Sequence, residues 1–326
     1  MKLLILKILK TSFVNHAFRF SIYLWTLLDN IFRRFILNRM QVSGTVKLQV
    51  DELKFKMYSN WDDQIVRLLY FEGLEYAEWG EVRLFKELSK QSKTVLDVGA
   101  NTGLYSLISK LSNPDLSVYA FEPYLFNLNR LKKNIALNRL TDQIEIIDKA
   151  VGDSNSEIEF AVPEVDQICD TISADIDWTN KFYRDFMSYK NIKFQQMTLD
   201  EFVAKEKITS IDLIKIDVEN CELNVFKGAL NLLSKHSPII QVEMFVDSER
   251  VEFYESTLKP LGYYCYLILK EGLIRTESLV DNPDCRNFIF SKQKSSSEYL
   301  SFSNLSALID EIKPSPNPVG SSAISS

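Results

Sequence analysis

The stretch that decides the fold is VLDVGANTG, residues 95–103. Its first half is apolar apart from Asp97, which is typical of a buried strand, and the glycines then mark a sharp turn. Gly99 lets the chain turn tightly, and together with Gly103 it lets the backbone come close to a ligand. The N-terminus of the helix expected next suits a carboxylate or phosphate. The G-x-x-x-G spacing lacks the G-x-G-x-x-G order of a dinucleotide site.

Strands and helices alternate on both sides of this turn. Apolar strands are expected at residues 93–99, 116–123, 144–153, 211–219, 238–245, 263–269 and 286–292. Helices are expected at residues 76–90, 104–111, 125–137, 223–234 and 248–258. Short, nearly continuous apolar strands between helices predict an α/β fold with a doubly wound, mostly parallel sheet. Residues 44–58 alternate polar and apolar around Asp51-Glu52, which predicts a β-hairpin.

Charge and composition divide the chain into three parts. Residues 1–43 form a basic arm, residues 44–292 the α/β domain, and the Ser- and Pro-rich residues 293–326 an expected disordered tail. Residues 1–46 carry a net charge of +6, so the remainder of this −6 chain carries −12. Apolar residues at helical spacing within residues 18–40 predict an amphipathic helix. It either packs on the domain or contacts an anionic membrane surface through residues 1–40, and both readings stay open.

Several classes of protein are disfavoured. The negative charge argues against a nucleic-acid partner. The four cysteines are widely spaced without a CxxC pair, so neither a zinc site nor a disulfide framework is expected. No secretory signal is evident, and the uncharged apolar residues 20–28 are too few to span a bilayer. We therefore expect a cytoplasmic protein, with peripheral membrane contact as the open alternative.

Carboxylates gather where the expected strands end. Glu122 follows Gly99 by 23 residues, at the end of the second strand, where it can accept hydrogen bonds from both hydroxyls of a ribose or else cap the next helix. Lys215, Asp217 and Glu219 share one parity of a strand. A buried lysine needs a partner, which Asp217 or Asp97 can supply. Glu243 ends the next strand and should reach the same rim.

These residues resemble the FkbM family of methyltransferases. The matching segments, in the family's order, are DVGANTG (97–103), YS (105–106), FEP (121–123), Asn134, Asn138, AVGD (150–153), TLDEF (198–202), IDLIKIDVE (211–219), FKGA (226–229) and PIIQVE (238–243). The family usually reads DVEGAE where this chain has Asn220-Cys221 in place of Gly-Ala. Residues 161–195 match no segment of the family and are expected to shape an acceptor pocket.

The resemblance implies a Rossmann-like sheet of seven strands, mostly parallel with the last strand antiparallel. It also implies transfer of a methyl group from S-adenosyl-L-methionine to a hydroxyl of a small molecule or glycan, such as a sugar or secondary metabolite. Carried over by residue, Asp97, Gly99, Asn101 and Gly103 would line the methionine end of the cofactor and Glu122 its ribose. Asp148, Lys149 and Ala150 would lie near the adenine, and Asp217 and Glu219 would face the reacting centre.

A hydroxyl acceptor must lose its proton, which calls for a general base. With two histidines in the chain and neither at the rim, we expect a carboxylate: Asp217 first, then Glu219 or Glu243, with Lys215 as the charged partner. A divalent ion held by these carboxylates is an alternative that we rank below direct base catalysis. Two other functions stay open: a nicotinamide-dependent oxidoreductase, and a non-catalytic Rossmann-like binding module, at which Asn220-Cys221 hints.

Overall fold

The computed structural model describes residues 42–71, 73, 79–163, 173, 175, 189–282 and 285–314. The amphipathic helix expected at residues 18–40 lies outside these ranges, so its contact with a membrane or with the domain stays a prediction. Among the described helices, none combines the length and the apolar character needed to cross a bilayer.

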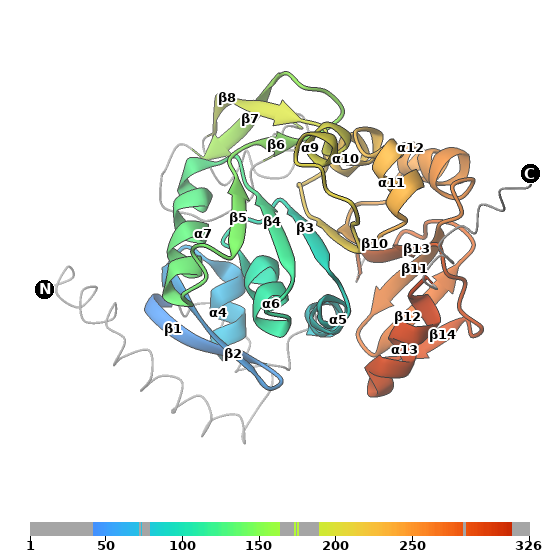
Figure 1. Ribbon diagram of the computed structural model, residues 1–326, viewed down its shortest axis with the longest axis horizontal. Coiled ribbons are helices and arrows are strands. Elements are labelled where there is room, and N and C mark those ends of the chain that lie inside the picture. Colours follow the sequence, from blue (N-terminus) through green and yellow to red (C-terminus); the bar gives the residue numbers. More distant parts are fainter. Residues whose placement is uncertain are drawn as a thin grey trace, which may run out of the picture.

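A nine-stranded sheet runs through the protein in the order β14-β12-β11-β13-β10-β9-β3-β4-β5 (Figure 1). Five neighbouring strands are parallel: β3 (Thr94–Val98), β4 (Ser117–Phe121), β5 (Ile144–Ile147), β9 (Leu213–Ile216) and β10 (Ile239–Glu243). The chain adds β4 and β5 to one side of β3 and later β9 and β10 to the other. At such a reversal a crevice opens outside the carboxyl ends of the strands.

The predicted seven strands with an antiparallel last strand are confirmed, and two further strands extend the sheet. β13 (Asn287–Ser291) lies antiparallel between β10 and β11 (Tyr264–Leu269). β12 (Gly272–Thr276) and β14 (Tyr299–Ser301) continue beyond β11. Sequence reasoning missed β12, which follows β11 after a two-residue turn, and β14, whose three residues are too few to show an alternating pattern.

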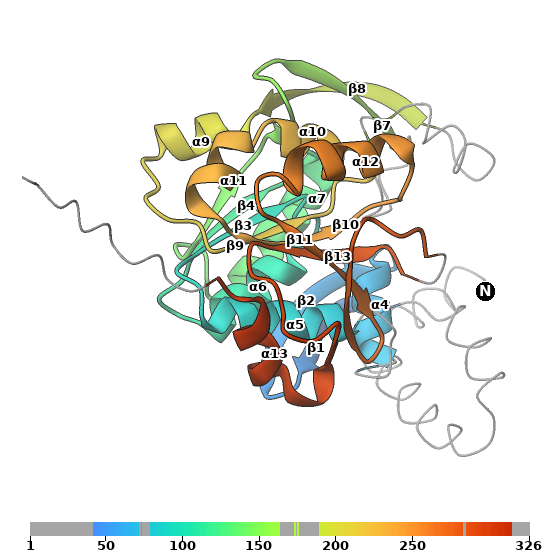
Figure 2. The same cartoon turned by 90° about the vertical axis from the view of Figure 1, so that its right-hand side faces the viewer.

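Helices cover both faces of the sheet, which confirms the doubly wound prediction. One layer contains α5 (Trp79–Lys90), α6 (Leu104–Ser112) and α7 (Leu125–Leu137). The other contains α9 (Leu199–Lys205), α10 (Glu222–Lys227), α11 (Leu230–His236) and α12 (Ser248–Phe253). Figure 2 shows α5 and α6 on one side of the strands and α9 to α12 on the other. Because strand residues alternate between faces, Val95 packs in the first layer and Leu96 in the second.

The predicted β-hairpin is present at the N-terminal end of the described chain. β1 (Ser43–Val50) and β2 (Leu53–Asn60) pair antiparallel around Asp51-Glu52. The buried Lys86 of α5 holds this turn through an ion pair with Asp51 at 2.6 Å. A short helix that the sequence analysis did not predict, α4 (Gln64–Phe71), follows the hairpin.

Two asparagines of the family segments fasten the hairpin to the domain. Asn134 of α7 accepts the N–H of Tyr58 at 2.8 Å and donates to the carbonyl of Thr102 at 2.8 Å. Asn138 accepts the N–H of Lys56 at 2.9 Å and donates to its carbonyl at 2.7 Å. Hairpin, α7 and glycine turn are therefore linked by side-chain hydrogen bonds, one of them fully buried.

A second sheet of three strands has the order β6-β8-β7. It consists of β6 (Ala150–Val151), β8 (Tyr189–Met197) and β7 (Glu157–Pro163). Its strands β7 and β8 contain residues 161–163 and 189–195 of the stretch that matches no family segment. Phe160 and Val162 bury their side chains in a small core of their own beside Ala150.

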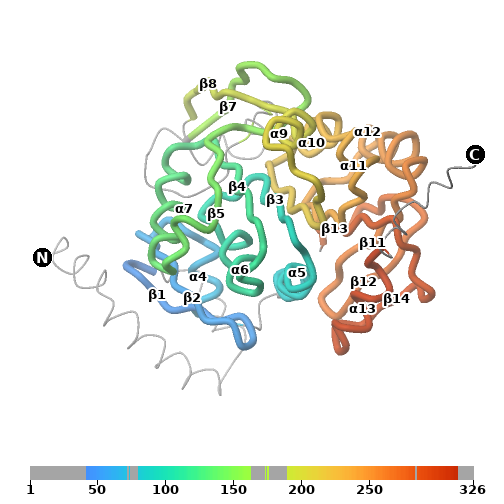
Figure 3. Tube along the Cα trace, viewed as in Figure 1, coloured from blue at the N-terminus to red at the C-terminus, as the bar shows by residue number. Residues whose placement is uncertain are grey.

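The prediction of a disordered tail over residues 293–326 is wrong for the part that the structure describes. After β14 a 3-10 turn, Phe302–Asn304, leads into α13 (Leu305–Ile312). Leu308, Ile309 and Ile312 are buried in the same core as α5, although the two helices stand far apart in the sequence (Figure 3). The apolar spacing 305, 308, 309, 312 is helical, and the serine-rich surroundings concealed it. Residues 315–326 lie outside the described part.

We expect Ile309→Ala to lower the free energy of unfolding by about 2–4 kcal/mol, because it removes buried apolar volume beneath α13. Ser306→Ala, on the exposed side of the same helix, should change it by less than about 0.5 kcal/mol. Urea unfolding of the three proteins provides the measurement. Equal stability of Ile309→Ala and the wild type would mean that α13 does not pack on the domain in solution.

Candidate active site

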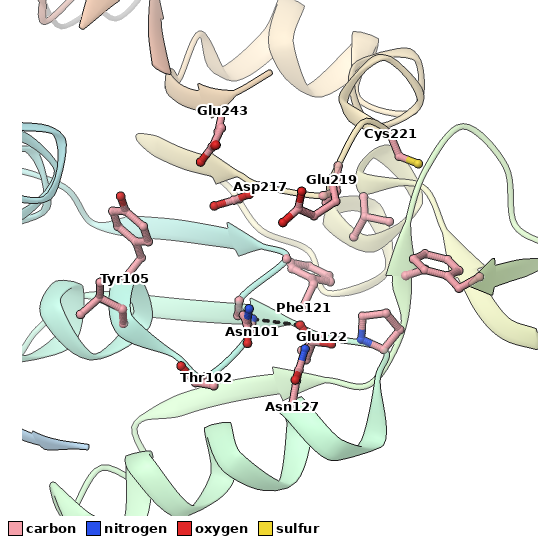
Figure 4. Close-up of a pocket in the computed structure, with 18 of the residues that line it drawn as sticks. Asn101, Thr102, Tyr105, Phe121, Glu122, Asn127, Asp217, Glu219, Cys221 and Glu243 are labelled. Atoms are coloured by element: carbon pink, nitrogen blue, oxygen red, sulfur yellow. Dashed lines mark hydrogen bonds between the residues drawn. The ribbon is translucent and has the colours of Figure 1, made fainter. Parts of the chain in front are cut away.

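A cavity of about 240 Å³ opens at the carboxyl ends of β3, β4, β9 and β10, where the strand order reverses. Its walls come from the turns after these strands, the start of α4 and the small sheet (Figure 4). The predicted site residues that line it are Gly99, Asn101, Glu122, Ala150, Asp217, Glu219 and Glu243. Those outside its lining are Asp97, Gly103, Asp148 and Lys215.

The glycine turn brings backbone to the cavity wall. Gly99 has a φ of +80°, and the N–H groups of Gly99 and Ala100 both donate to the carbonyl of Phe121, at 3.1 and 2.9 Å. A Cβ atom at Gly99 would lie 1.9 Å from the carbonyl oxygen of Asp217. Only glycine therefore allows the turn after β3 to touch the turn after β9.

Asp97 and Gly103 support this turn from behind. Asp97 is 1% exposed, and its Oδ2 accepts a hydrogen bond from the Ser106 hydroxyl at 2.5 Å. Burial raises the pKa of Asp97 to about 6, although Ser106 and Lys215 lower it. Gly103 has a φ of +93°, and a Cβ there would also lie 2.4 Å from Cδ1 of Leu131, so the left-handed backbone and the packing against α7, and not the approach of a ligand, require glycine.

Glu122 is the most deeply buried acid that lines the cavity, at 3% exposed. Oε2 accepts the N–H of Asn101 at 2.9 Å, and Oε1 accepts the N–H of Tyr124, just before α7, at 2.9 Å. Burial raises the pKa of Glu122 to about 7, although both N–H groups and Asn127 lower it. With Asn127 included, three donors occupy three of the four lone pairs of the carboxylate, so Glu122 caps the helix region and keeps one acceptor position for a ligand.

Lys215 lies behind the opposite wall. Its side chain is 1% exposed, and Nζ lies 3.3 Å from Oδ2 of Asp217. Burial alone lowers the pKa of Lys215, but the carboxylates of Asp217, Glu81 and Glu243 outweigh it and raise the pKa above its ordinary value. The Asp217 side chain is 34% exposed and faces the cavity. The partner that the sequence demanded for Lys215 is therefore Asp217.

Asp217, Glu219 and Glu243 form an acidic group across from Asn101 and Glu122. Figure 4 shows the three carboxylates, two from the turn after β9 and one from the end of β10, reaching toward one space. Among the described residues, no group of three or more histidine, cysteine, aspartate and glutamate side chains could hold a metal ion.

The turn after β9 keeps a left-handed backbone where the family has glycine. Glu219 and Asn220 have φ values of 52° and 75°. Asparagine adopts this region more readily than most residues, and its side chain adds partners here. Nδ2 of Asn220 donates to Asp175 at 2.7 Å, while the buried Arg250 donates to Asn220 Oδ1 at 2.7 Å and to its carbonyl at 3.0 Å. Asn220 thus stabilises the turn that carries Glu219, and Cys221 behind it lines the cavity.

Sequence reasoning missed many residues of the lining, among them Asp63, Asn127, Phe160 and Gln196. A signal existed for Asp63, because an aspartate before the helical pattern QIVRLLYF marks an N-cap. Phe160 and Gln196 belong to the small sheet, whose pairing joins residues far apart in the sequence. No local pattern places them in the cavity.

Comparisons with known proteins agree with this geometry. The family model of the methyltransferase FkbM domain matches residues 97–265. The 2-O-methyltransferase NoeI of Sinorhizobium fredii is 25% identical over 155 residues, covering 45% of this chain and 62% of that protein. The hexuronic acid methyltransferase AglP of Haloferax volcanii is 25% identical over 176 residues, covering 54% and 66%. Both matches span less than two thirds of the relative's own length.

A solved structure titled methyltransferase FkbM, from Methylobacillus flagellatus KT, is also similar to this chain. It is 17% identical with a TM-score of 0.37, and the match covers 71% of this chain and 55% of that one. The family model spans slightly more than half of the present chain and includes the glycine turn, Glu122 and the carboxylates after β9 and β10. The chain belongs to the FkbM methyltransferase family.

Proposed function

We propose that this chain is an S-adenosyl-L-methionine-dependent methyltransferase that acts on a hydroxyl of a sugar, glycan or secondary metabolite. One observation carries the proposal: buried Glu122 beside the glycine turn faces an acidic group across a single cavity. The first part suits a nucleoside ligand, and the second suits removal of a proton from an acceptor.

The charge of the cavity supports this cofactor over a dinucleotide. Among the described lining residues Lys149 alone is cationic, whereas five are carboxylates: Asp63, Glu122, Asp217, Glu219 and Glu243. S-adenosylmethionine carries a sulfonium and an ammonium group, and the negative potential of these carboxylates attracts both cations. The pyrophosphate of NAD would meet repulsion, which counts against an oxidoreductase.

The described residues fit the cofactor at three points. Glu122 has one acceptor position left for a ribose hydroxyl. The side-chain oxygen of Asn101 is buried without a hydrogen-bond partner in the described structure, so a donor of the ligand would satisfy it. Lys149 and Ala150 line the side where the adenine is expected. When bound, S-adenosylmethionine supplies a methyl group that is already activated for transfer.

Asp217 is the best candidate for the general base. It is partly exposed to the cavity, and the buried ammonium of Lys215 restrains the orientation of its carboxylate. No histidine occurs among the described residues of the lining, and the carboxylates are its most acidic side chains, so one of them is ionised and ready to accept a proton near neutral pH. Glu219 and Glu243 are the alternatives, because they reach the same space.

The acidic group also restricts the acceptor. Three carboxylates at the acceptor side repel an acid and favour a neutral, hydroxylated molecule. The name of NoeI, a 2-O-methyltransferase, supports oxygen as the acceptor atom. The hexuronic acid in the name of AglP fits this rim less well, because its carboxylate would face the acidic group.

Calorimetry should detect binding of S-adenosylmethionine and S-adenosylhomocysteine and none of NAD. Glu122→Ala should weaken binding by about 1.5–3 kcal/mol, because a buried charged acceptor is lost. Glu145→Ala, an exposed carboxylate on neighbouring β5, is the matched control and should leave the affinity unchanged. Tight binding of NAD, or equal affinities for wild type and Glu122→Ala, would contradict the assignment.

The stability of the ligand-free protein should fall as pH rises from about 5 to 8. Burial raises the pKa of Glu122 from 4.5 to about 7, so the folded state binds a proton over a range where the unfolded chain has lost it. Stability from this group is complete below the unfolded pKa and is lost as pH passes the folded one, up to about 3 kcal/mol. Glu122→Gln should flatten the profile measured by urea unfolding. If wild type and Glu122→Gln gave the same dependence of stability on pH, the titration of Glu122 would not be its source.

Asp217→Asn should lower methyl transfer by roughly a hundredfold or more and leave donor binding intact, since the amide keeps the shape and loses the base. The rate is measured as transfer of a tritiated methyl group from labelled S-adenosylmethionine to acceptors in a cell extract. Calorimetry measures donor binding. Lys215→Met should lower both rate and stability, because it leaves carboxylates without their buried cation. A fully active Asp217→Asn enzyme would shift the base to Glu219 or Glu243.

A further inference from the structure

Asp63 is a carboxylate in the cavity wall that has no evident use in the fold for one of its oxygens. It is 5% exposed and lines the cavity immediately before α4. Oδ1 accepts the N–H of Val66 at 2.8 Å and so caps the helix. Oδ2 is buried and, within the described part of the chain, accepts no hydrogen bond of good geometry, although the Thr102 side chain lies close enough to lower the pKa of the carboxyl group. One oxygen of this carboxylate therefore stabilises a helix, and the other lacks a well-aligned hydrogen-bond donor.

The neighbouring Asp62 has a cationic partner of the kind that Asp63 lacks in the described structure. Asp62 forms a two-pronged ion pair with Arg130, with N–O distances of 2.9 and 2.7 Å. Arg130 is thereby committed to Asp62, and no cation of the described residues forms an ion pair with Asp63. Burial raises the pKa of Asp63 to about 6, although the Val66 N–H, the Thr102 side chain and Arg130 lower it. A buried acceptor without a donor is costly, so a ligand cation would relieve the site.

The position of Asp63 identifies the part of the ligand that it meets. Thr102, its neighbour, belongs to the glycine turn and is linked to β2 through Asn134. In Figure 4 Thr102 lies on one side of Asn101 and Glu122 on the other. Asp63, as the neighbour of Thr102, therefore lies beside the glycine turn and the N-terminus of α6. This end of the cavity is away from Glu122, the carboxylate expected to bind the ribose.

We propose that Asp63 Oδ2 accepts the α-ammonium group of the methionine part of the cofactor, an inference that rests on the function proposed above. The amino-acid end of the cofactor carries one positive and one negative charge. The N-terminus of α6 suits the carboxylate, and Asp63 suits the ammonium through a charge-assisted hydrogen bond. With Glu122 on the ribose, the two acids hold the cofactor at two separate points.

The test compares two ligands on two proteins by calorimetry. The ligands are S-adenosylhomocysteine and its desamino analogue, in which hydrogen replaces the α-amino group. Asp63→Asn keeps an oxygen for the Val66 N–H and removes the charge. Wild type should bind S-adenosylhomocysteine about ten- to a hundredfold more tightly than the analogue, the scale of a buried charge-assisted hydrogen bond. Asp63→Asn should lose most of this preference and keep its affinity for the analogue.

Asp200→Asn is the matched control. Asp200 also accepts helix N–H groups, those of Asn231 and Leu232, and it lies outside the lining of the cavity. Its substitution should leave both affinities unchanged. Thermal unfolding establishes that Asp63→Asn folds, and Asp63→Ser, which keeps a capping oxygen on a shorter side chain, replaces it if it does not.

Three results would overturn the inference. Equal preference for S-adenosylhomocysteine in wild type and Asp63→Asn would show that another group binds the ammonium. An equal loss of affinity for both ligands would show that Asp63 acts only through the fold. Failure of the wild type to bind either ligand would refute the proposed function itself, and it differs visibly from the first two outcomes, in which the wild type binds.

Discussion

The close approach of Gly99 to the backbone of Asp217 is the constraint on which the rest of the site depends. A Cβ at Gly99 would collide with the Asp217 carbonyl, and the Asp217 N–H donates to the carbonyl of Val98 at 3.0 Å. The ends of β3 and β9 therefore touch where the strand order reverses. Because of that contact, Glu122 on one half of the sheet and the acidic group on the other face the same cavity rather than separate surfaces.

The site concentrates acids that the fold does not neutralise. Burial raises the pKa of Asp63, Asp97 and Glu122 above the ordinary range, and it does the same for Glu222 beneath the turn after β9. The buried Lys215 and Arg250 offset part of this cost on the side of β9. A domain has only about 5–15 kcal/mol of net stability, so such groups persist where function uses them. A cationic ligand that binds the folded state would return some of that stability.

Several segments that carry the family resemblance act on the fold rather than on the ligand. Thr198 caps α9 by accepting the N–H of Glu201, and Asp200 accepts the N–H groups that open α11. Asn134 and Asn138 hold the hairpin on α7. These contacts keep the helices and the hairpin in place around the sheet, and the cavity takes its shape from them. The resemblance to the family in these segments therefore reflects a shared fold before it reflects a shared ligand.

The sequence by itself determined the local elements: the parallel strands, the glycine turn, the hairpin at Asp51-Glu52 and the carboxylates at the strand ends. Strand period and turn chemistry are short-range properties, so a few neighbouring residues suffice to express them. Only the tertiary structure decided that Asp97 and Gly103 lie outside the cavity lining, that Asp63 enters its wall, and that the helix of residues 305–312 packs on α5. Each of these outcomes depends on a packing partner far along the chain, such as Leu131 against Gly103, and no local pattern can specify such a partner.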